Sequence, residues 1–371
     1  MNNRFVSFTT VFLLVINIIS FGQSKTVTLS GKVTDEKTGE VLPFANVFIN
    51  NSSIGTTTNE NGQYTLGNLP IGNIEIAVSF LGYTTIKQTL RFEQPGMKTV
   101  TFKMREGMEL AGVTIYSKKG KKREQYLKIL SQQLLGEGKF SKLSKILNPE
   151  VINISMEDNG HILARSNSPV KIENKALGYY IYQDLDDFDF YEGKLYYGGS
   201  TRFELMKPSS EQEQKKWRAN QKEAYQGSLK QLLTSMVTDS VRENGFKIFQ
   251  EIPDSLRMFS SVRSVNGYNP IKNHIHNRLE EINGHELIQP GELETELLVV
   301  SGTKLEVFNL RKRGRTPYTD MSFGFTQITL PQGYFVITPQ GWVIAPMGFE
   351  LAGDLGNNRF SSLLPADWKR D

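Results

Sequence analysis

The sequence predicts a signal peptide, then an all-β sandwich, and then a larger α+β domain. Short apolar stretches separated by glycine, proline or asparagine recur along residues 24–104, which is the pattern of a β-sandwich. The first 23 residues join a basic start to an apolar core. Helical spacing of apolar residues appears only in the later part of the chain. We therefore divide the chain into 1–23, 24–104, 105–125 and 126–371, the third range being a short strand and a basic linker.

The N-terminus has the features of a secretory signal. Arg4 supplies the positive charge, Val11–Ile19 supplies the apolar core, and Ser20 and Gly22 are small enough for a cleavage site. An uncleaved anchor is the alternative, but a membrane span needs about 20 apolar residues, and this run is interrupted by Asn17. We expect an exported protein, periplasmic or outer-membrane-associated, with no transmembrane span after signal cleavage. Without cysteine it is not a lipoprotein.

The strands of the sandwich follow from apolar–polar alternation and from the turns between them. Asn59–Gly62 and Leu69–Gly72 are turn sequences. Pro43 interrupts or edges the second strand, because proline cannot donate to a strand ladder. The predicted strands are Val27–Val33, Val41–Ile49, Gln63–Leu66, Ile74–Phe80, Thr84–Phe92 and Lys98–Lys103.

Several motifs in this part resemble the carboxypeptidase regulatory-like domain. They are Gly31–Asp35, Ala45–Phe48, Gly55–Tyr64 and Val78–Tyr83. The resemblance implies a prealbumin- or immunoglobulin-like sandwich (a carbohydrate-binding-like fold) that serves as a non-catalytic attachment or spacer. It also implies a secreted or outer-membrane protein of Bacteroidetes. A fold alone does not assign a function.

Composition excludes several classes of protein. The chain contains no cysteine, so disulfides, thiolate metal sites and a cysteine nucleophile are absent. A chain of this size folds by core burial alone. The formal net charge of +4 is too modest to indicate a nucleic-acid partner.

The segment after the sandwich carries one short strand and a basic run. Leu110–Tyr116 followed by basic residues resembles the segment behind the same module in TonB-dependent nutrient receptors. That resemblance implies that Val113 and Ile115 contact a partner by adding a strand to its sheet. A solvated linker is the alternative.

The second domain is predicted to mix helices and strands. A helix runs from Lys122 towards Asn148-Pro149, and Ser209–Glu213 resembles a capping box that starts a helical region split at Gly227. A β-rich tail begins at Phe246. The strands between the helices are Val151–Met156, His161–Arg165, Val170–Glu173 and a hairpin pair made of Leu177–Gln183 and Asp189–Tyr197.

The second domain also resembles known sequences. Ile172–Tyr180, Lys216–Trp217, Arg218–Ser228 and Leu363–Trp368 are similar to a family of Bacteroidetes proteins that carry the regulatory-like module at the front. This resemblance implies an architecture, and it implies no activity.

Two groups of residues are candidate metal ligands. His274 and His276 would share one face of a strand, and His285 could complete a zinc site with nearby carboxylates. The acidic run Asp184–Phe190 suits calcium in its oxygen ligands but lacks the loop's glycine and its final glutamate. Polar loop histidines and a solvated hairpin are the alternatives, and we predict no cofactor.

Aromatic residues form a candidate partner surface. Exposed on one face they would bind sugar rings or a protein, and the alternative is that half of them enter the core. The residues are Tyr179, Tyr180, Tyr182, Tyr196 and Tyr197. The basic cluster Arg311–Arg315 is predicted to be a hairpin tip.

The sequence favours a non-enzymatic exported binding or scaffold protein of the cell envelope, acting on a protein or glycan near the outer membrane. Two alternatives stay open: an envelope metallo-hydrolase with its site near His274–His285, and an accessory component of a TonB-dependent uptake system. No nucleophile elbow or phosphate loop is present.

Overall fold

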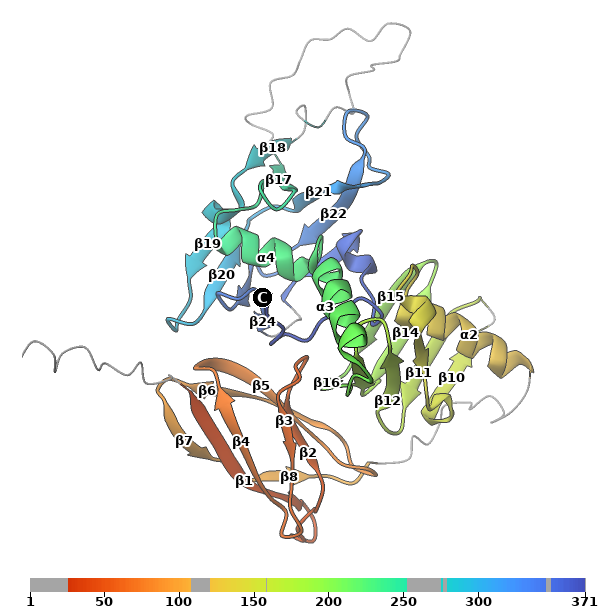
Figure 1. Cartoon of the computed structure of the whole chain (residues 1–371), viewed down its shortest axis with the longest axis vertical. Helices are drawn as coiled ribbons and strands as arrows, with labels where there is room; N and C mark the ends of the chain where they lie inside the picture. Colours follow the sequence, from red (N-terminus) through yellow and green to blue (C-terminus); the bar gives the residue numbers. More distant parts are fainter. Residues whose placement is uncertain are drawn as a thin grey trace, which may run out of the picture.

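The computed structural model describes residues 26–107, 121–157, 159–251, 275, 279–344 and 348–370. This part of the chain is mostly β, with six sheets and three α-helices (Figure 1). None of its helices is both long and apolar enough to cross a membrane. The predicted signal peptide lies outside the described residues.

The predicted N-terminal β-sandwich is confirmed. One sheet has the order β4-β1-β7 with β8 also paired to β1, and the other has the order β3-β2-β5-β6. Apolar residues of both sheets enclose one core, and Leu29, Val33 and Ile76 are fully buried in it. The strands are β1 (Val27–Asp35), β2 (Asn46–Ile49), β3 (Gly55–Thr57), β4 (Gln63–Leu69), β5 (Gly72–Ser79), β6 (Ile86–Phe92), β7 (Gly96–Thr99) and β8 (Phe102–Met104).

Side-chain hydrogen bonds and positive φ angles set where some of these strands begin and end. Asn59 Oδ1 accepts hydrogen bonds from the backbone N–H of Asn61 and Gln63, and Gly62 takes a positive φ of 67°, as the predicted turn requires. The predicted strand from Val41 is shorter than expected, because Phe44, just after Pro43, has a φ of 61° and β2 begins only at Asn46.

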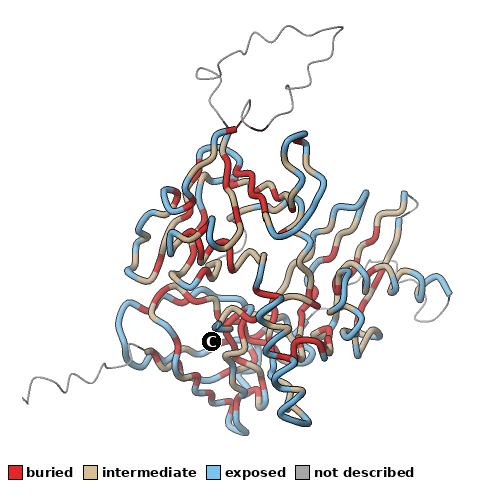
Figure 2. Tube along the Cα trace, turned by 45° about the horizontal axis from the view of Figure 1, so that its top comes forward, coloured by how far each residue is buried: buried red, intermediate tan, exposed pale blue. Residues whose placement is uncertain are grey.

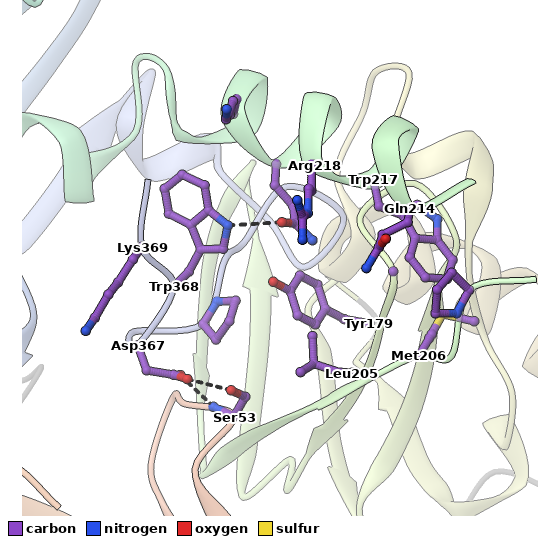
Figure 3. Close-up of a pocket in the computed structure, with 15 residues that line it drawn as sticks. Ser53, Tyr179, Leu205, Met206, Gln214, Trp217, Arg218, Asp367, Trp368 and Lys369 are labelled. Carbon is purple, nitrogen blue, oxygen red and sulfur yellow. Dashed lines mark hydrogen bonds between the residues drawn. The ribbon is translucent and has the colours of Figure 1, made fainter. Parts of the chain in front are cut away.

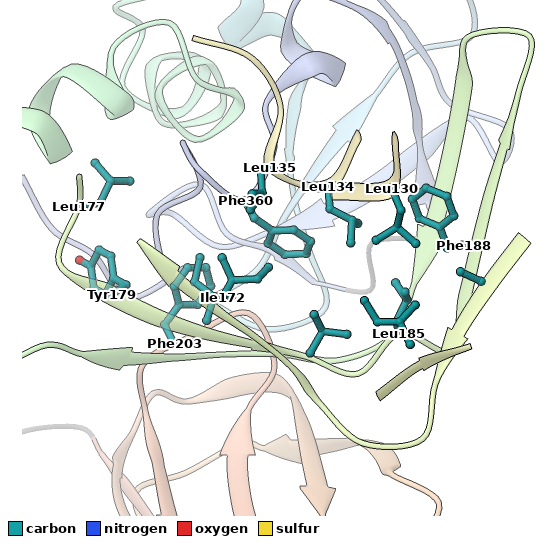
Figure 4. Packing of buried hydrophobic residues seen from close by; sticks show 14 of the residues in the cluster. Leu130, Leu134, Leu135, Ile172, Leu177, Tyr179, Leu185, Phe188, Phe203 and Phe360 are labelled. Atoms are coloured by element: carbon teal, nitrogen blue, oxygen red, sulfur yellow. The ribbon is translucent and has the colours of Figure 1, made fainter. Parts of the chain in front are cut away.

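The middle of the chain forms two sheets and a helix around a second core. The sheets have the orders β10-β11-β14-β15 and β16-β13-β12-β9. Figure 4 shows Leu130 and Leu134 of the helix, together with Phe360, packed over the sheet that carries Ile172 and Phe203. The elements are α2 (Lys121–Leu135), β9 (Ser144–Ile146), β10 (Ile152–Met156), β11 (Ile162–Ser166), β12 (Val170–Asn174), β13 (Tyr179–Gln183), β14 (Asp187–Tyr191), β15 (Lys194–Gly198) and β16 (Thr201–Leu205).

Two predictions in this part are wrong. The helix α2 ends at Leu135 instead of near Asn148, because Gly136 takes a φ of 78° and its N–H closes the last turn on Gln132 O. The predicted hairpin pair does not form either, since β13 pairs with β12 and β16. Instead β14 and β15 form their own hairpin through Glu192 and Gly193, which both have positive φ.

The last part of the chain builds a third core. Two sheets, β18-β17-β21-β22-β25 and β19-β20-β23-β24, enclose it together with α4. The elements are α3 (Glu211–Tyr225), α4 (Leu229–Val237), β17 (Phe246–Glu251), β18 (Leu279–Ile282), β19 (Ile288–Pro290), β20 (Leu297–Val300), β21 (Leu305–Arg313), β22 (Phe323–Thr329), β23 (Tyr334–Ile337), β24 (Val343–Ile344) and β25 (Glu350–Gly353).

The predicted helix start and helix break are confirmed. The Ser210 side chain caps α3 by accepting from Glu213 N, and the Glu213 carboxylate accepts from the backbone N–H of Ser209. Gly227, with a φ of 73°, separates α3 from α4. The basic cluster at Arg311–Arg315 is exposed where β21 ends.

The sandwich contacts the sheet β16-β13-β12-β9 through hydrogen bonds between the loop after β2 and strand β16, and we call this contact the polar seam. Ser52 forms a parallel bridge with Arg202 of β16, Asn51 N donates to Thr201 O over 2.8 Å, and Phe203 N donates to Ser52 O over 2.9 Å. Ser52 is fully buried. The sandwich thus extends the β16 edge of this sheet. Figure 2 shows buried residues concentrated inside the folded units and exposed residues at the loop tips.

Candidate functional site

A cleft of about 400 Å³ lies between α3, the loop after β16 and the C-terminal segment. Its volume falls in the range of about 300–1,000 Å³ that is typical of ligand sites. Figure 3 shows Tyr179 and Leu205 below α3, with Trp368 on the side of the C-terminal segment. The lining residues are Ser53, Gly178, Tyr179, Leu205, Met206, Pro208, Gln214, Trp217, Arg218, Gln221, Lys222, Pro365, Asp367, Trp368 and Lys369.

Three side chains of α3 hold the helix on the turn between β12 and β13. Trp217 Nε1 donates to Lys175 O over 2.9 Å, Asn220 Nδ2 donates to Ala176 O, and Gln221 Nε2 donates to Leu177 O. Three successive carbonyls of the turn are therefore capped by one helix. The turn closes at Gly178.

Gly178 is required by this contact. It has a φ of 77°, and a Cβ at this position would lie 2.5 Å from ring atoms of Trp217. Any side chain would displace the indole. The tryptophan consequently lies against the backbone, and only 7% of its surface is exposed.

Asn174 connects the same turn to the C-terminal segment. Its Oδ1 accepts from Ala176 N and Leu177 N, and its Nδ2 donates to Phe360 O and Ser361 O. The residue is fully buried, so all four hydrogen bonds form away from water and each would be costly to lose.

Lys230 of α4 fixes the far wall of the cleft. Its Nζ donates to Ala366 O over 2.7 Å, to Trp368 O over 2.5 Å and, more weakly, to Pro365 O over 3.5 Å. Burial lowers the pKa of Lys230 to about 8, and the charge of Asp367 partly opposes this effect.

Trp368 is positioned by three neighbours, one of which is Lys230, whose Nζ lies 5.7 Å from the centroid of its ring. Its Nε1 donates to Gln221 Oε1 over 3.1 Å, and its ring packs against Tyr225 with 5.1 Å between centroids. The indole is half-buried. Its orientation is therefore fixed before any ligand arrives.

The sandwich also contributes to the cleft. Ser53 donates to the Asp367 carboxylate through its backbone N–H, over 2.7 Å, and through its hydroxyl, over 2.5 Å. The cleft is thus completed by residues from the sandwich, the middle sheet, α3 and the C-terminal segment. Burial raises the pKa of the floor residue Tyr179, so its hydroxyl stays protonated at neutral pH.

The tyrosines named from the sequence lie in three places. Tyr179 is on the floor of the cleft, whereas Tyr180 and Tyr182 lie on the opposite face of β13. There Lys171 Nζ lies 4.5 Å from the Tyr180 ring centroid and 5.3 Å from that of Tyr182. Arg202 covers Tyr182 at 4.0 Å. These two rings are therefore already engaged by cations.

Tyr196 and Tyr197 line a second cleft of about 430 Å³ beside α4. Tyr196 is 53% exposed, and the Tyr197 ring packs against Phe360 with 5.4 Å between centroids. The structure does not bring these residues together with Tyr179. Val113 and Ile115 lie outside the described residues.

The candidate zinc ligands lie apart from the cleft or outside the described residues. His274 and His276 are in the latter group. His285, in a short 3₁₀ helix, donates from Nδ1 to Met236 O over 3.0 Å. Within the described ranges no three His, Asp or Glu side chains are grouped as a metal site would need.

The acidic run proposed for calcium faces separate protein partners. Asp184 accepts from Thr85 and Ser200. Its neighbours pair with three different residues: Asp186 with Lys87 of β6, Asp187 with Arg165 of β11, and Asp189 with His161, which lies just before β11.

Sequence reasoning missed most of the cleft. Trp217, Arg218, Asp367 and Trp368 fall within the resembling motifs, and the sequence assigns a role to none of them. One feature of the sequence could have pointed to the cleft, because two of the three tryptophans in the chain fall in those motifs.

Comparison with known families identifies the N-terminal module. Residues 29–122 match the CarboxypepD_reg-like domain, which confirms the resemblance seen in the sequence. The class of the module is therefore a CarboxypepD_reg-like β-sandwich. No curated protein matches the chain.

Solved structures give only weak similarity. A 3-chlorocatechol 1,2-dioxygenase from Rhodococcus opacus is 12% identical, with 22% of this chain and 61% of that chain covered and a TM-score of 0.19. A catechol 1,2-dioxygenase from Acinetobacter is 15% identical over 24% of this chain and 55% of that chain, with a TM-score of 0.20. A candidate carbohydrate-binding protein from Bacteroides uniformis is 11% identical over 48% and 79%, with a TM-score of 0.18.

Proposed function

We propose that the protein is a non-enzymatic exported binding protein of the cell envelope, whose cleft beside α3 takes a glycan near the outer membrane. The observation that carries this proposal is the cleft itself, in which hydrogen bonds hold the side chains of Trp368, Gln221 and Asp367 in place before binding. The apolar N-terminal run and the CarboxypepD_reg-like module support the envelope location.

The cleft offers both surfaces that a sugar needs. Trp368, which is half-buried, presents aromatic surface for the apolar face of a pyranose ring, whereas Tyr179 is a buried part of the floor. Gln214 and Arg218 supply donors and an acceptor for hydroxyl groups. Because a hydrogen bond already orients Trp368, this ring loses little freedom on binding, whereas the exposed side chains of Gln214 and Arg218 become ordered only then.

The sandwich acts as a scaffold in this proposal. It reaches the cleft through Ser53 and also contacts the loop between β19 and β20, where Arg91 pairs with Glu292 over 2.7 Å and Asn73 N donates to Glu296 Oε1 over 3.1 Å. These contacts orient the binding part relative to the N-terminus.

The test is binding of the full chain to a panel of neutral and charged oligosaccharides by isothermal titration calorimetry. Trp368→Ala should weaken binding about tenfold or more, as expected for a central aromatic contact. Trp368→Phe should retain part of the affinity.

The matched control is Tyr334→Ala, an exposed aromatic on β23 that does not line the cleft. Melting temperatures of all variants separate loss of binding from loss of fold. If no oligosaccharide binds, or if Trp368→Ala binds as the wild type does, the glycan function is wrong.

A further inference from the structure

We infer that the cleft selects an acidic sugar, and that Arg218 is the residue that determines this specificity. The inference rests on the proposed glycan function and names its ligand class. The anion would be the carboxylate of a uronic acid.

Arg218 belongs to a stripe of polar residues on α3. Gln214, Arg218 and Lys222 follow one another at intervals of four residues, so they lie along one side of the helix, and all three line the cleft. Figure 3 shows the Arg218 side chain pointing from α3 toward Tyr179 and Trp368.

The Arg218 guanidinium is available to a ligand. The side chain is exposed, and it forms no ion pair or hydrogen bond with the part of the chain that the structure describes. Its planar fork of N–H donors matches both oxygens of a carboxylate. Flanking aromatic surface would partly exclude water and strengthen that contact.

Asp367, the one acid among the described residues that line the cleft, does not neutralise Arg218. The Asp367 carboxylate already accepts two hydrogen bonds from Ser53, and Figure 3 shows it at the sandwich side of the cleft. Lys222, which is also exposed and has no ion pair among the described residues, adds positive charge on the helix side. The α3 side of the cleft is therefore positive.

An acidic sugar explains the arrangement better than an acidic peptide. Charge alone would suit both, but the indole of Trp368 beside the guanidinium suits a pyranose ring, which offers an apolar face to the indole and carries its carboxylate at the edge. An acidic peptide enters the test as a competing outcome.

The experiment compares hexagalacturonate with its fully methyl-esterified form, two probes with the same sugar backbone and different charge. Calorimetry with the full chain at low ionic strength should show at least about tenfold tighter binding of the acid, as expected for a charge-assisted bidentate contact. Arg218→Gln should remove this preference while retaining the affinity for the ester. Arg218→Lys should keep part of the preference, because charge remains but the fork is lost.

Lys215→Gln is the matched control, because it removes the same charge from an exposed position of α3 that does not line the cleft. It should retain the preference. The inference is overturned if the ester binds as tightly as the acid, if Arg218→Gln keeps the preference or loses the ester as well, or if hexaglutamate displaces hexagalacturonate at equal concentration.

The same titrations separate this inference from the proposed function. Binding of neutral oligosaccharides without binding of hexagalacturonate would leave the glycan function standing and refute the acidic ligand. Failure of every oligosaccharide would refute both.

Discussion

The buried ammonium of Lys230 should make stability depend on pH in an unusual direction. Burial lowers its pKa from 10.5 to about 8, because the charged form loses more hydration than the neutral amine does. Lys230→Met keeps a side chain of similar length and removes both the charge and the donors to the C-terminal segment. Comparing the two proteins across pH isolates the contribution of the charge.

The sign follows from proton binding. Between about pH 8 and 10.5 the unfolded chain holds the lysine proton and the folded protein has released it, so raising the pH favours the folded state. The interval between these two values corresponds to about 3 kcal/mol when it is crossed completely. About 2 kcal/mol of this should be gained by about pH 9.5.

The assay is urea unfolding followed by tryptophan fluorescence at about pH 7 and about pH 9.5. The free energy of unfolding of wild type relative to Lys230→Met should rise by about 2 kcal/mol between these conditions. Lys215→Met, which removes an exposed charge from α3, should show no comparable change. A gap between wild type and Lys230→Met that is equal at both pH values would refute the desolvated ammonium.

Three further outcomes are expected. Asn174→Ala should lower the free energy of unfolding by about 2–4 kcal/mol, because it removes four buried hydrogen bonds; Asn153→Ala on β10, with a single exposed side-chain bond, is the control, and equal losses at both positions would contradict this role. Burial raises the pKa of Asp184 above 3.8, so wild-type stability should fall as the pH rises through the folded-state pKa. In urea titrations, the free energy of unfolding of Asp184→Asn relative to that of wild type should therefore increase between about pH 4 and pH 7. A constant difference would count against a buried carboxyl. The hydrogen bond to Asp189 raises the pKa of His161 above 6.5, so this contact stabilises the protein below that pH and is lost as the pH rises through the folded-state pKa; an NMR titration should show a lower pKa in Asp189→Asn, and an unchanged value would disprove the pairing.

Local sequence patterns were sufficient to predict a turn or a helix end where the side chains of one segment bond to its own backbone. The turn at Asn59–Gly62 and the helix start at Ser210 depend on side chains that bond to the adjacent backbone, and such bonds are readable from spacing. The break at Gly227 is local in the same way. These features were predicted from sequence for that reason.

Strand pairing was not predictable in this manner. Tyr179–Gln183 and Asp187–Tyr191 have similar alternation, yet they belong to different sheets. Alternation indicates which face of a strand is buried, and it carries no information about the neighbouring strand. The two-residue turn at Glu192-Gly193 decides the pairing of β14, and a lone Glu-Gly is a weaker signal than Asn-Gly.

The cleft was missed because its parts come together only through long-range contacts. Ser53 reaches Asp367, and Trp368 reaches Gln221, across 314 and 147 positions of sequence respectively. No periodicity links residues at such separations. The dense run of tyrosines in the sequence includes one residue of the cleft floor, Tyr179, and its other members lie elsewhere.

The polar seam gives the N-terminal module a more specific role than that of a tether. Apolar contacts between two units tolerate small sliding motions, whereas hydrogen bonds depend on direction and fix one register. At this seam the backbone of Asn51 and Ser52 pairs with Thr201 and Phe203, and the Asn50 side chain accepts from Thr201 N over 2.8 Å. The next residue along the loop, Ser53, bonds to the C-terminal segment that forms one wall of the cleft. Displacing the sandwich would therefore break the seam and release Asp367 together, so the binding geometry of the cleft depends on how the module is docked.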